Sequence, residues 1–83
     1  MAPAAQSPWQ GLPPEVVAFH DKRSLCDHFR GEEAYDTDRA AFLKAELART
    51  CTGSDQALAL LRQRYAGDPK VIASLRNYED SIE

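Results

Sequence analysis

Long apolar runs are absent from this 83-residue sequence. The longest, residues 57–61, has five residues, whereas a membrane-spanning helix needs about 18. Clustered positive charge is also lacking, because the ten lysine and arginine residues are spread along the chain and are outnumbered by thirteen acidic ones. Nucleic-acid-binding domains usually concentrate their basic residues on one surface. We therefore expect neither insertion into a membrane nor binding to nucleic acid.

Sequence signatures of catalysis are missing too. There is no Cys-x-x-Cys redox pair, no P-loop, no dinucleotide fingerprint and no Ser-His-Asp arrangement. Cys26 and His28 are two residues apart on an expected helix, so their side chains point in different directions. The sequence thus predicts a noncatalytic protein that uses no cofactor.

The composition is that of a folded domain. Apolar residues make up 43% of the chain, charged residues make up 28%, and the net charge is only −3. Disordered segments instead combine low hydrophobicity with high net charge. A single domain of this size buries only about 60% of the surface that its unfolded chain exposes. A covalent cross-link would therefore contribute much of its stability.

Two cysteines, Cys26 and Cys51, can supply that cross-link. An even cysteine count in a small secreted domain is typical of a disulfide, and the alternative is two buried free thiols that act as small apolar residues. The start, MAPAAQSPW, lacks both the basic segment and the apolar segment of a secretory signal. It resembles an exported protein after signal removal. We expect a periplasmic or secreted protein, with a cytoplasmic protein as the alternative.

Apolar residues recur at three- and four-residue intervals, and no segment alternates as a strand does. Residues 1–11 lack this spacing, which predicts a flexible tail before a single domain over residues 12–83. Trp9 would either fold back from that tail or be left for a partner. The expected helices cover residues 14–30, 36–50, 54–66 and 69–78. We predict an all-α fold, a compact array of about four short helices with a Cys26–Cys51 disulfide.

Polar residues mark the expected helix starts. Asp36 or Thr37 is a suitable N-cap of the second helix, and Asp68, which a proline follows, is a suitable N-cap of the fourth. Ser54 is expected to cap the third helix, where Thr52 and Asp55 have the spacing of a capping box.

The disulfide constrains the connection between the first two helices. In a tight hairpin, Cys26 would face a residue near Ala41 and not Cys51, given a rise of about 1.5 Å per helical residue. The intervening chain, if extended, could cover about 20 Å, nearly the length of the second helix. We therefore predict that residues 32–36 are stretched along the surface and that Tyr35 holds them there.

One cluster contains metal-ligand residue types. His20 and Asp27 are seven residues apart, and His28 and Glu32 are four apart, so each pair shares a helical face. Such pairs can bind a transition metal, although a structural zinc site needs four ligands. The alternative is that both histidines lie on a solvated side of the helix.

An acidic cluster follows the first helix at Glu32, Glu33, Asp36 and Asp38. Paired carboxylates can act as acid and base or bind calcium, but the EF-hand pattern is missing. The simplest interpretation is a solvated connection whose last two carboxylates favour the start of the next helix. Three of these carboxylates, with Tyr35 among them and Trp9 in the N-terminal tail, are the candidates for partner binding: Trp9, Glu32, Glu33, Tyr35 and Asp36.

Three functional hypotheses remain. The leading one is a noncatalytic periplasmic or secreted protein-interaction module that meets an unknown protein through a helix face or the acidic connection. The second is a metal-binding or metal-responsive protein that uses His20, Asp27, His28 and Glu32. The third is a small cytosolic regulator with free thiols.

Overall fold

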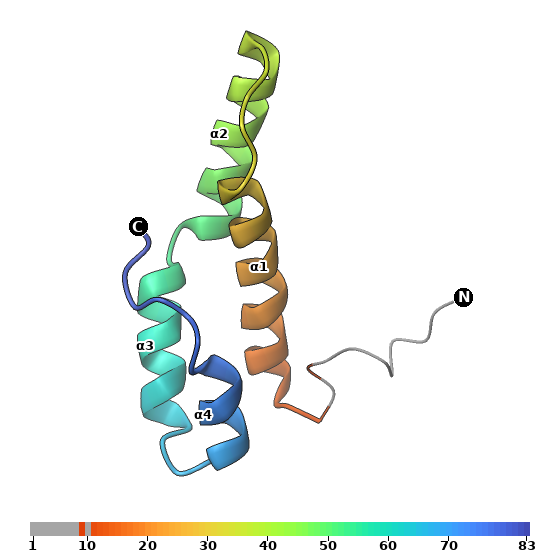
Figure 1. Ribbon diagram of the computed structural model, residues 1–83. Helices are drawn as coiled ribbons and strands as arrows, with labels where there is room; N and C mark the ends of the chain where they lie inside the picture. Colours follow the sequence, from red (N-terminus) through yellow and green to blue (C-terminus); the bar gives the residue numbers. More distant parts are fainter. Residues whose placement is uncertain (1–8, 10) are drawn as a thin grey trace, which may run out of the picture.

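The computed structural model describes residue 9 and residues 11–83, and the chain forms four helices there. They are α1 (Pro14–Arg30), α2 (Thr37–Cys51), α3 (Ser54–Arg64) and α4 (Pro69–Leu75) (Figure 1). The described residues contain no strand, so the all-α prediction is confirmed. Most of the predicted flexible tail, residues 1–8 and 10, lies outside the described residues.

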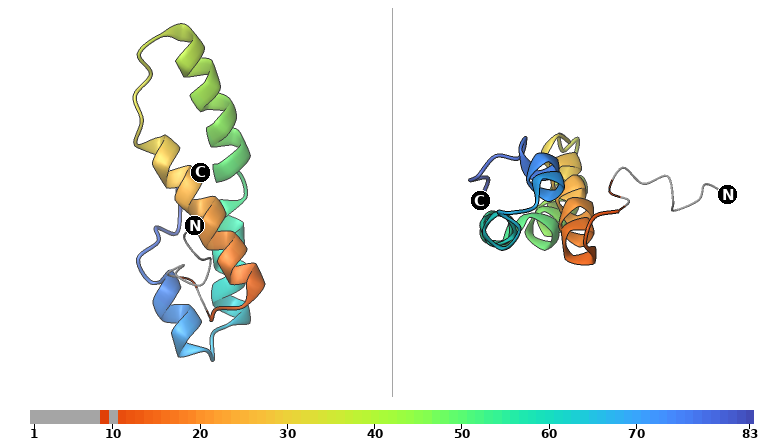
Figure 2. Two further views of the ribbon diagram at one scale, coloured as in Figure 1. Left: turned by 90° about the vertical axis from the view of Figure 1, so that its right-hand side faces the viewer. Right: turned by 90° about the horizontal axis from the view of Figure 1, so that it is seen from below.

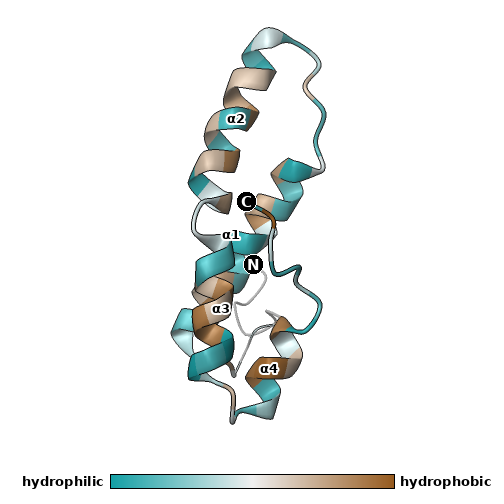
Figure 3. Ribbon diagram, turned by 90° about the vertical axis from the view of Figure 1, so that its left-hand side faces the viewer, coloured by the Kyte–Doolittle hydropathy of each residue, from teal (hydrophilic) through white to brown (hydrophobic). Residues whose placement is uncertain are grey.

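The N-terminal half of α1 packs with α3 and α4 around one apolar core, and these parts form the body of the molecule (Figure 1). The buried core residues are Val16, Phe19, Leu58, Leu61, Val71 and Leu75. Their three- and four-residue spacing follows from the period of the helix, and full burial of one such side chain stabilises the fold by about 1.5–3 kcal/mol. In Figure 3, strongly hydrophobic residues accordingly lie on α3 and α4, whereas the segment after α4 is mainly hydrophilic.

Residues 31–51, the connection and α2, form an arm that extends beyond the body (Figure 2). The connection, residues 31–36, continues past the end of α1 without regular secondary structure, and α2 then returns antiparallel to α1. The predicted stretched connection is therefore present. The role predicted for Tyr35 is wrong, because its side chain is 80% exposed. The connection is held instead by the ion pair between Glu32 and Arg39, whose guanidinium also lies 4.7 Å from the ring centre of Phe42.

The return of α2 brings Cys51 to Cys26, and the predicted disulfide is present. The two Cα atoms are 5.0 Å apart, inside the usual range for a disulfide. Cys26 is fully buried, and beside the bridge Thr50 is buried and donates its hydroxyl to the Glu46 carbonyl at 2.7 Å. The bridge therefore joins the base of the arm to the C-terminal part of α1.

The start of α3 differs from the predicted cap. The N-cap is Gly53, with a positive φ of 82° that favours glycine, and it makes no side-chain cap. Ser54 is the first residue of α3, and its buried hydroxyl accepts a hydrogen bond from Arg23 at 3.1 Å. The predicted capping box is also absent, because the Asp55 carboxylate binds the backbone N–H groups of Ile82 and Glu83.

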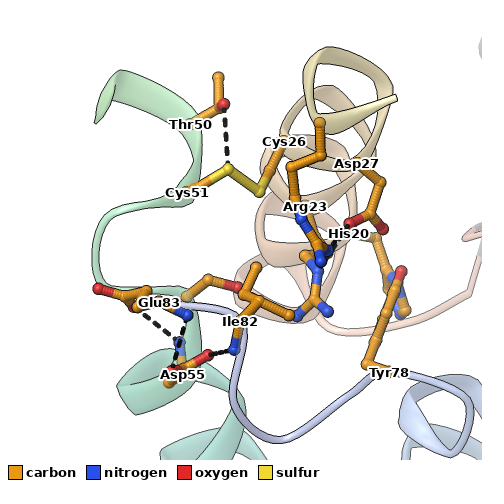
Figure 4. A network of polar contacts seen from close by, with 12 residues as sticks. His20, Arg23, Cys26, Asp27, Thr50, Cys51, Asp55, Tyr78, Ile82 and Glu83 are labelled. Atoms are coloured by element: carbon orange, nitrogen blue, oxygen red, sulfur yellow. Dashed lines mark hydrogen bonds and ion pairs between the residues drawn. A yellow bond between two sulfur atoms is a disulfide. The ribbon is translucent and has the colours of Figure 1, made fainter. Parts of the chain in front are cut away.

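Residues 76–83 form a C-terminal strap that returns along α3 (Figure 1). Its far end is held by the two hydrogen bonds to Asp55 (Figure 4). Its near end is held by Arg62, which donates to the carbonyl oxygens of Leu75 and Tyr78 at 3.0 and 3.1 Å. The strap thereby places Tyr78 against the body.

Asp36, one of the two residues predicted to cap α2, is its N-cap, since its carboxylate accepts the Arg39 backbone N–H at 2.7 Å. We expect Asp36→Ala to lower the free energy of unfolding by about 1 kcal/mol, the usual loss of an N-cap. Urea denaturation measures this loss. Asp38→Ala is the matched control, because Asp38 lies in the same first turn without being the N-cap. Equal losses in the two variants would contradict the capping role.

Candidate functional site

An open groove lies between α1 and α3, with a volume of about 410 Å³. Each helix contributes four residues at the positions i, i+3, i+4 and i+7, which lie on one helical face. The lining residues are Glu15, Ala18, Phe19 and Lys22 from α1, and Ala57, Leu60, Leu61 and Arg64 from α3. Neither α4 nor the strap contributes to the lining. The groove is therefore a two-helix surface without a third helix packed on it in the described part of the chain.

The middle of the groove is apolar. Phe19 and Leu61 form its floor and also belong to the buried core. Leu60 is different, because half of its surface is exposed. A large aliphatic side chain beside an apolar groove offers surface whose burial by a partner is favourable.

The ends of the groove are charged. Glu15 at the start of α1 pairs with Arg64 at the end of α3 and also accepts a hydrogen bond from the Tyr65 hydroxyl. That hydrogen bond is the main reason why the pKa of Tyr65 is raised. Lys22 lies at the other end, where it donates to the Thr52 carbonyl at 3.3 Å. Within residues 11–83, no carboxylate is close enough to form an ion pair with it.

These end contacts fix the relative register of the two helices. Because Glu15 begins α1 and Arg64 ends α3, their pairing shows that the helices are antiparallel. At the opposite end, Lys22 and Ala57 also line the same small cavity of about 30 Å³. The lining residues of each helix form one stripe, at 15–22 on α1 and at 57–64 on α3. The centres of these two stripes therefore lie at the same level along the groove.

A second cluster surrounds His20, whose side chain is fully buried in the body (Figure 4). Its Nδ1 lies 2.6 Å from the Tyr78 hydroxyl, and its Nε2 lies 3.0 Å from the Ser74 hydroxyl. Since Ser74 donates its own proton to the Val71 carbonyl, Nε2–H must be the donor to Ser74. Nδ1 then accepts from Tyr78. This arrangement satisfies the neutral imidazole completely.

Burial also favours that neutral form. Desolvation lowers the pKa of His20, and the nearby charge of Asp21 opposes this shift only in part. Trp9 stacks on the imidazole with ring centres 3.8 Å apart and planes 7° apart. Trp9, which the sequence left either folded back or free for a partner, therefore lies against the body.

Arg23 is the other buried ionisable residue of the body, with 3% of its surface exposed. It donates to Asp27 at 3.2 Å and to Ser54 at 3.1 Å. Its guanidinium carbon lies 4.9 Å from the ring centre of Tyr78. Arg23 thus links α1, α3 and the strap (Figure 4).

The four metal-ligand candidates are not brought together. His20 faces Ser74 and Tyr78, and Asp27 is bound by Arg23 and Arg30. His28 is mostly exposed, and its Nε2 lies 3.5 Å from Glu32, which also pairs with Arg39. No group of three or more histidine, cysteine or acidic residues that could hold a metal occurs among the described residues.

Four of the five partner-binding candidates lie together in the connection of the arm, whereas Trp9 lies against the body. Glu32 and Asp36 serve the arm through their contacts with Arg39, while Glu33 and Tyr35 are exposed. Sequence analysis missed the groove, although its two stripes are present in the sequence at 15–22 and 57–64. Spacing predicts a stripe on one helix but does not indicate which stripes on different helices lie side by side.

Comparisons with protein-family models, with curated proteins and with solved structures gave no match to this chain. Among the described residues, no helix combines the length and the apolar character that crossing a membrane requires.

Proposed function

We propose that this protein is a noncatalytic interaction module of the periplasm or the extracellular space, and that it binds a helix of a protein partner in the α1–α3 groove. The observation that carries the proposal is the open groove, with its apolar middle and its charged ends. Grooves of this kind bind amphipathic helices, whose apolar side chains enter at three- and four-residue intervals.

The shape of the groove favours a helix as the bound element. Its walls are two antiparallel helices whose lining stripes span about two turns each. A third helix can pack onto two such stripes by placing its side-chain ridges between theirs. Leu60, half exposed on one wall, would become buried on binding.

The state of the reactive side chains supports binding over catalysis. Both ring nitrogens of His20 are hydrogen-bonded inside the body, and the guanidinium of Arg23 is held by Asp27 and Ser54. Neither cysteine is a free thiol, because the two are joined. In the described part of the chain, these groups therefore stabilise the fold.

The disulfide also supports the proposed compartment. Disulfides persist in oxidising compartments and are rare in the cytosol, where thiols are kept reduced. An intact Cys26–Cys51 bridge in the native protein would fit the periplasm or the extracellular space. Alkylation of free thiols before and after reduction measures its state.

The binding function is tested by a photoreactive amino acid placed at Leu60 in the native host. Irradiation is expected to give one discrete cross-linked adduct, because Leu60 lies at the groove where the partner helix would pack. Peptide mapping by mass spectrometry should place the cross-link in a partner helix with apolar residues at three- and four-residue intervals.

Leu25 provides the matched control. It is also a leucine on a helix, with 44% of its surface exposed against 50% for Leu60, but it does not line the groove. The same photoreactive residue at Leu25 should give no corresponding adduct. No adduct from Leu60, or equal adducts from both positions, would contradict the proposed function.

A further inference from the structure

We infer that His20 is a pH-sensitive latch, whose protonation releases Trp9 and the strap residue Tyr78 from the body while the helical core stays folded. The His20 side chain is fully buried at the point where α1, α4, the strap and Trp9 meet. Each neighbouring part contributes one side chain that encloses the ring, and these side chains are Ser74, Tyr78 and Trp9. The state of one imidazole therefore bears on three separate parts of the molecule.

The hydrogen bonds of His20 suit only the neutral ring. Because the Ser74 hydroxyl donates to the Val71 carbonyl at 2.8 Å, it accepts from Nε2–H of the imidazole. The other nitrogen, Nδ1, therefore accepts from the Tyr78 hydroxyl at 2.6 Å. A proton added at Nδ1 would point at the hydrogen of that hydroxyl. Protonation thus removes the hydrogen bond that Tyr78 donates to α1.

The charged side chains of α1 give a protonated His20 little support. Asp21 is exposed, and its charge opposes the lowering of the His20 pKa by burial only in part. Arg23, three residues further along α1, is buried and carries the same sign of charge as an imidazolium. The carboxylate of Asp27 is already held by Arg23 at 3.2 Å.

The other parts that enclose the ring supply no buried counter-charge among the described residues. The strap faces it with the Tyr78 hydroxyl, and α4 faces it with the Ser74 hydroxyl. The one charged residue of α4, Lys70, is positive, and the described residues before α1 carry no charge. The acidic side chains of the strap are all exposed: Glu79, Asp80 and Glu83. Because a buried charge without a partner is unfavourable, the imidazolium has to become hydrated.

Hydration of His20 requires only the parts outside the helices to move. On α4, Val71 and Leu75 are fully buried in the core, so this helix is expected to stay in place. Trp9 and Tyr78 are only partly buried and lie outside the helices. Buried histidines act as pH sensors where protonation favours a second arrangement, and here that arrangement is one in which the two aromatic side chains have left the ring.

Release would present aromatic surface in an acidic environment. Trp9 and Tyr78 would become exposed, together with the side of Phe19 that faces Tyr78, since their ring centres are 5.5 Å apart. Aromatic side chains are enriched at protein interfaces. The far end of the strap would remain in place, because Asp55 binds the backbone of its last two residues.

The test is hydrogen exchange of the disulfide-intact chain, followed by NMR from about pH 7.5 to about pH 5 and corrected for the intrinsic exchange rate. The backbone amides of Leu12 and Tyr78 report the opening. Their partners are the carbonyl oxygens of Trp9 and Leu75. Both amides should be less protected than the core amide of Leu58 at every pH. Below about pH 6.5 their protection should fall by at most about tenfold per pH unit, because the open form binds more protons than the closed form.

Two variants identify the group that takes up the proton. His20→Gln cannot titrate, so the protection of the Leu12 and Tyr78 amides should no longer depend on pH in this range. His28→Gln is the matched control and should keep the dependence, because the His28 side chain is 64% exposed. Circular dichroism checks that each variant is folded, and the comparison of reporter and core amides in the wild type needs no variant.

Three results would overturn the latch. Equal protection of the Tyr78 and Leu58 amides would show that the strap opens only when the whole fold opens. Low protection of Leu12 and Tyr78 that does not change with pH would show that their opening leaves His20 buried. A pH dependence of the same size in His20→Gln would mean that a different group takes up the proton.

Discussion

Replacement of both cysteines, Cys26→Ala with Cys51→Ala, is expected to lower the free energy of unfolding by about 3.5 kcal/mol. The bridge closes a loop over a sequence separation of 25 residues, and its loss frees that loop in the unfolded chain. For a domain of this size, such a loss is comparable with the whole stability. Urea denaturation of the double variant and of the oxidised wild type measures the difference. A loss below about 1 kcal/mol would contradict this assignment of stability.

The loss should be uneven along the chain. Within α2, only Leu43 and Thr50 are buried, so the arm runs beside α1 but buries few side chains besides the disulfide. Hydrogen exchange of the double variant should therefore rise most in α2, while the amides around Leu58 in the core of the body change least. Equal acceleration in α2 and α3 would show that the bridge stabilises the whole molecule as one unit.

Acidification below about pH 6.5 is expected to destabilise the fold through His20. Burial lowers the pKa of the folded histidine, whereas the unfolded chain keeps the ordinary value. Between these two values the unfolded state binds more protons, so stability falls as the pH falls. One such group gives a slope of at most about 1.4 kcal/mol per pH unit. Above about pH 6.5 its contribution is constant.

His20→Gln separates this effect from that of the carboxylates. Glutamine keeps hydrogen-bonding atoms near Ser74 and Tyr78 but cannot take up a proton, so the variant should lose the slope between pH 7 and pH 5. His28→Gln is the control and should keep the slope, because the His28 side chain is 64% exposed. Urea denaturation at a series of pH values gives the slopes. A wild-type slope that His20→Gln leaves unchanged would assign the acid sensitivity to other groups.

Local features of the fold were predictable because their causes are local. Asp36 begins α2 and Asp68 begins α4 through carboxylates that accept nearby backbone N–H groups, as their residue types indicate. The stretched connection was predictable for a different reason. Once Cys26 and Cys51 are paired, the length of α2 requires a connection of about the same length.

Features that depend on distant residues were predicted poorly. Ser54 is a favourable cap by type, but Arg23, 31 positions earlier, binds its hydroxyl instead. Tyr35 was predicted to hold the connection along the surface, yet it is exposed. Whether a side chain makes a local or a tertiary hydrogen bond depends on the fold of the whole chain. So does the distance to which one helix pair extends beyond the others.

The sequence alone determined the helical class, the helix limits set by Asp36 and Pro69, and the cysteine pair that joins the arm to α1. Periodicity, capping and chain length act over a few residues, so they can be evaluated without the rest of the fold. Only the tertiary structure decided that His20 is buried as a neutral hydrogen-bonded group and that the stripes at 15–22 and 57–64 line one groove. The physical reason is that both features require segments more than 30 residues apart to lie side by side, and the packing of the whole core determines that arrangement.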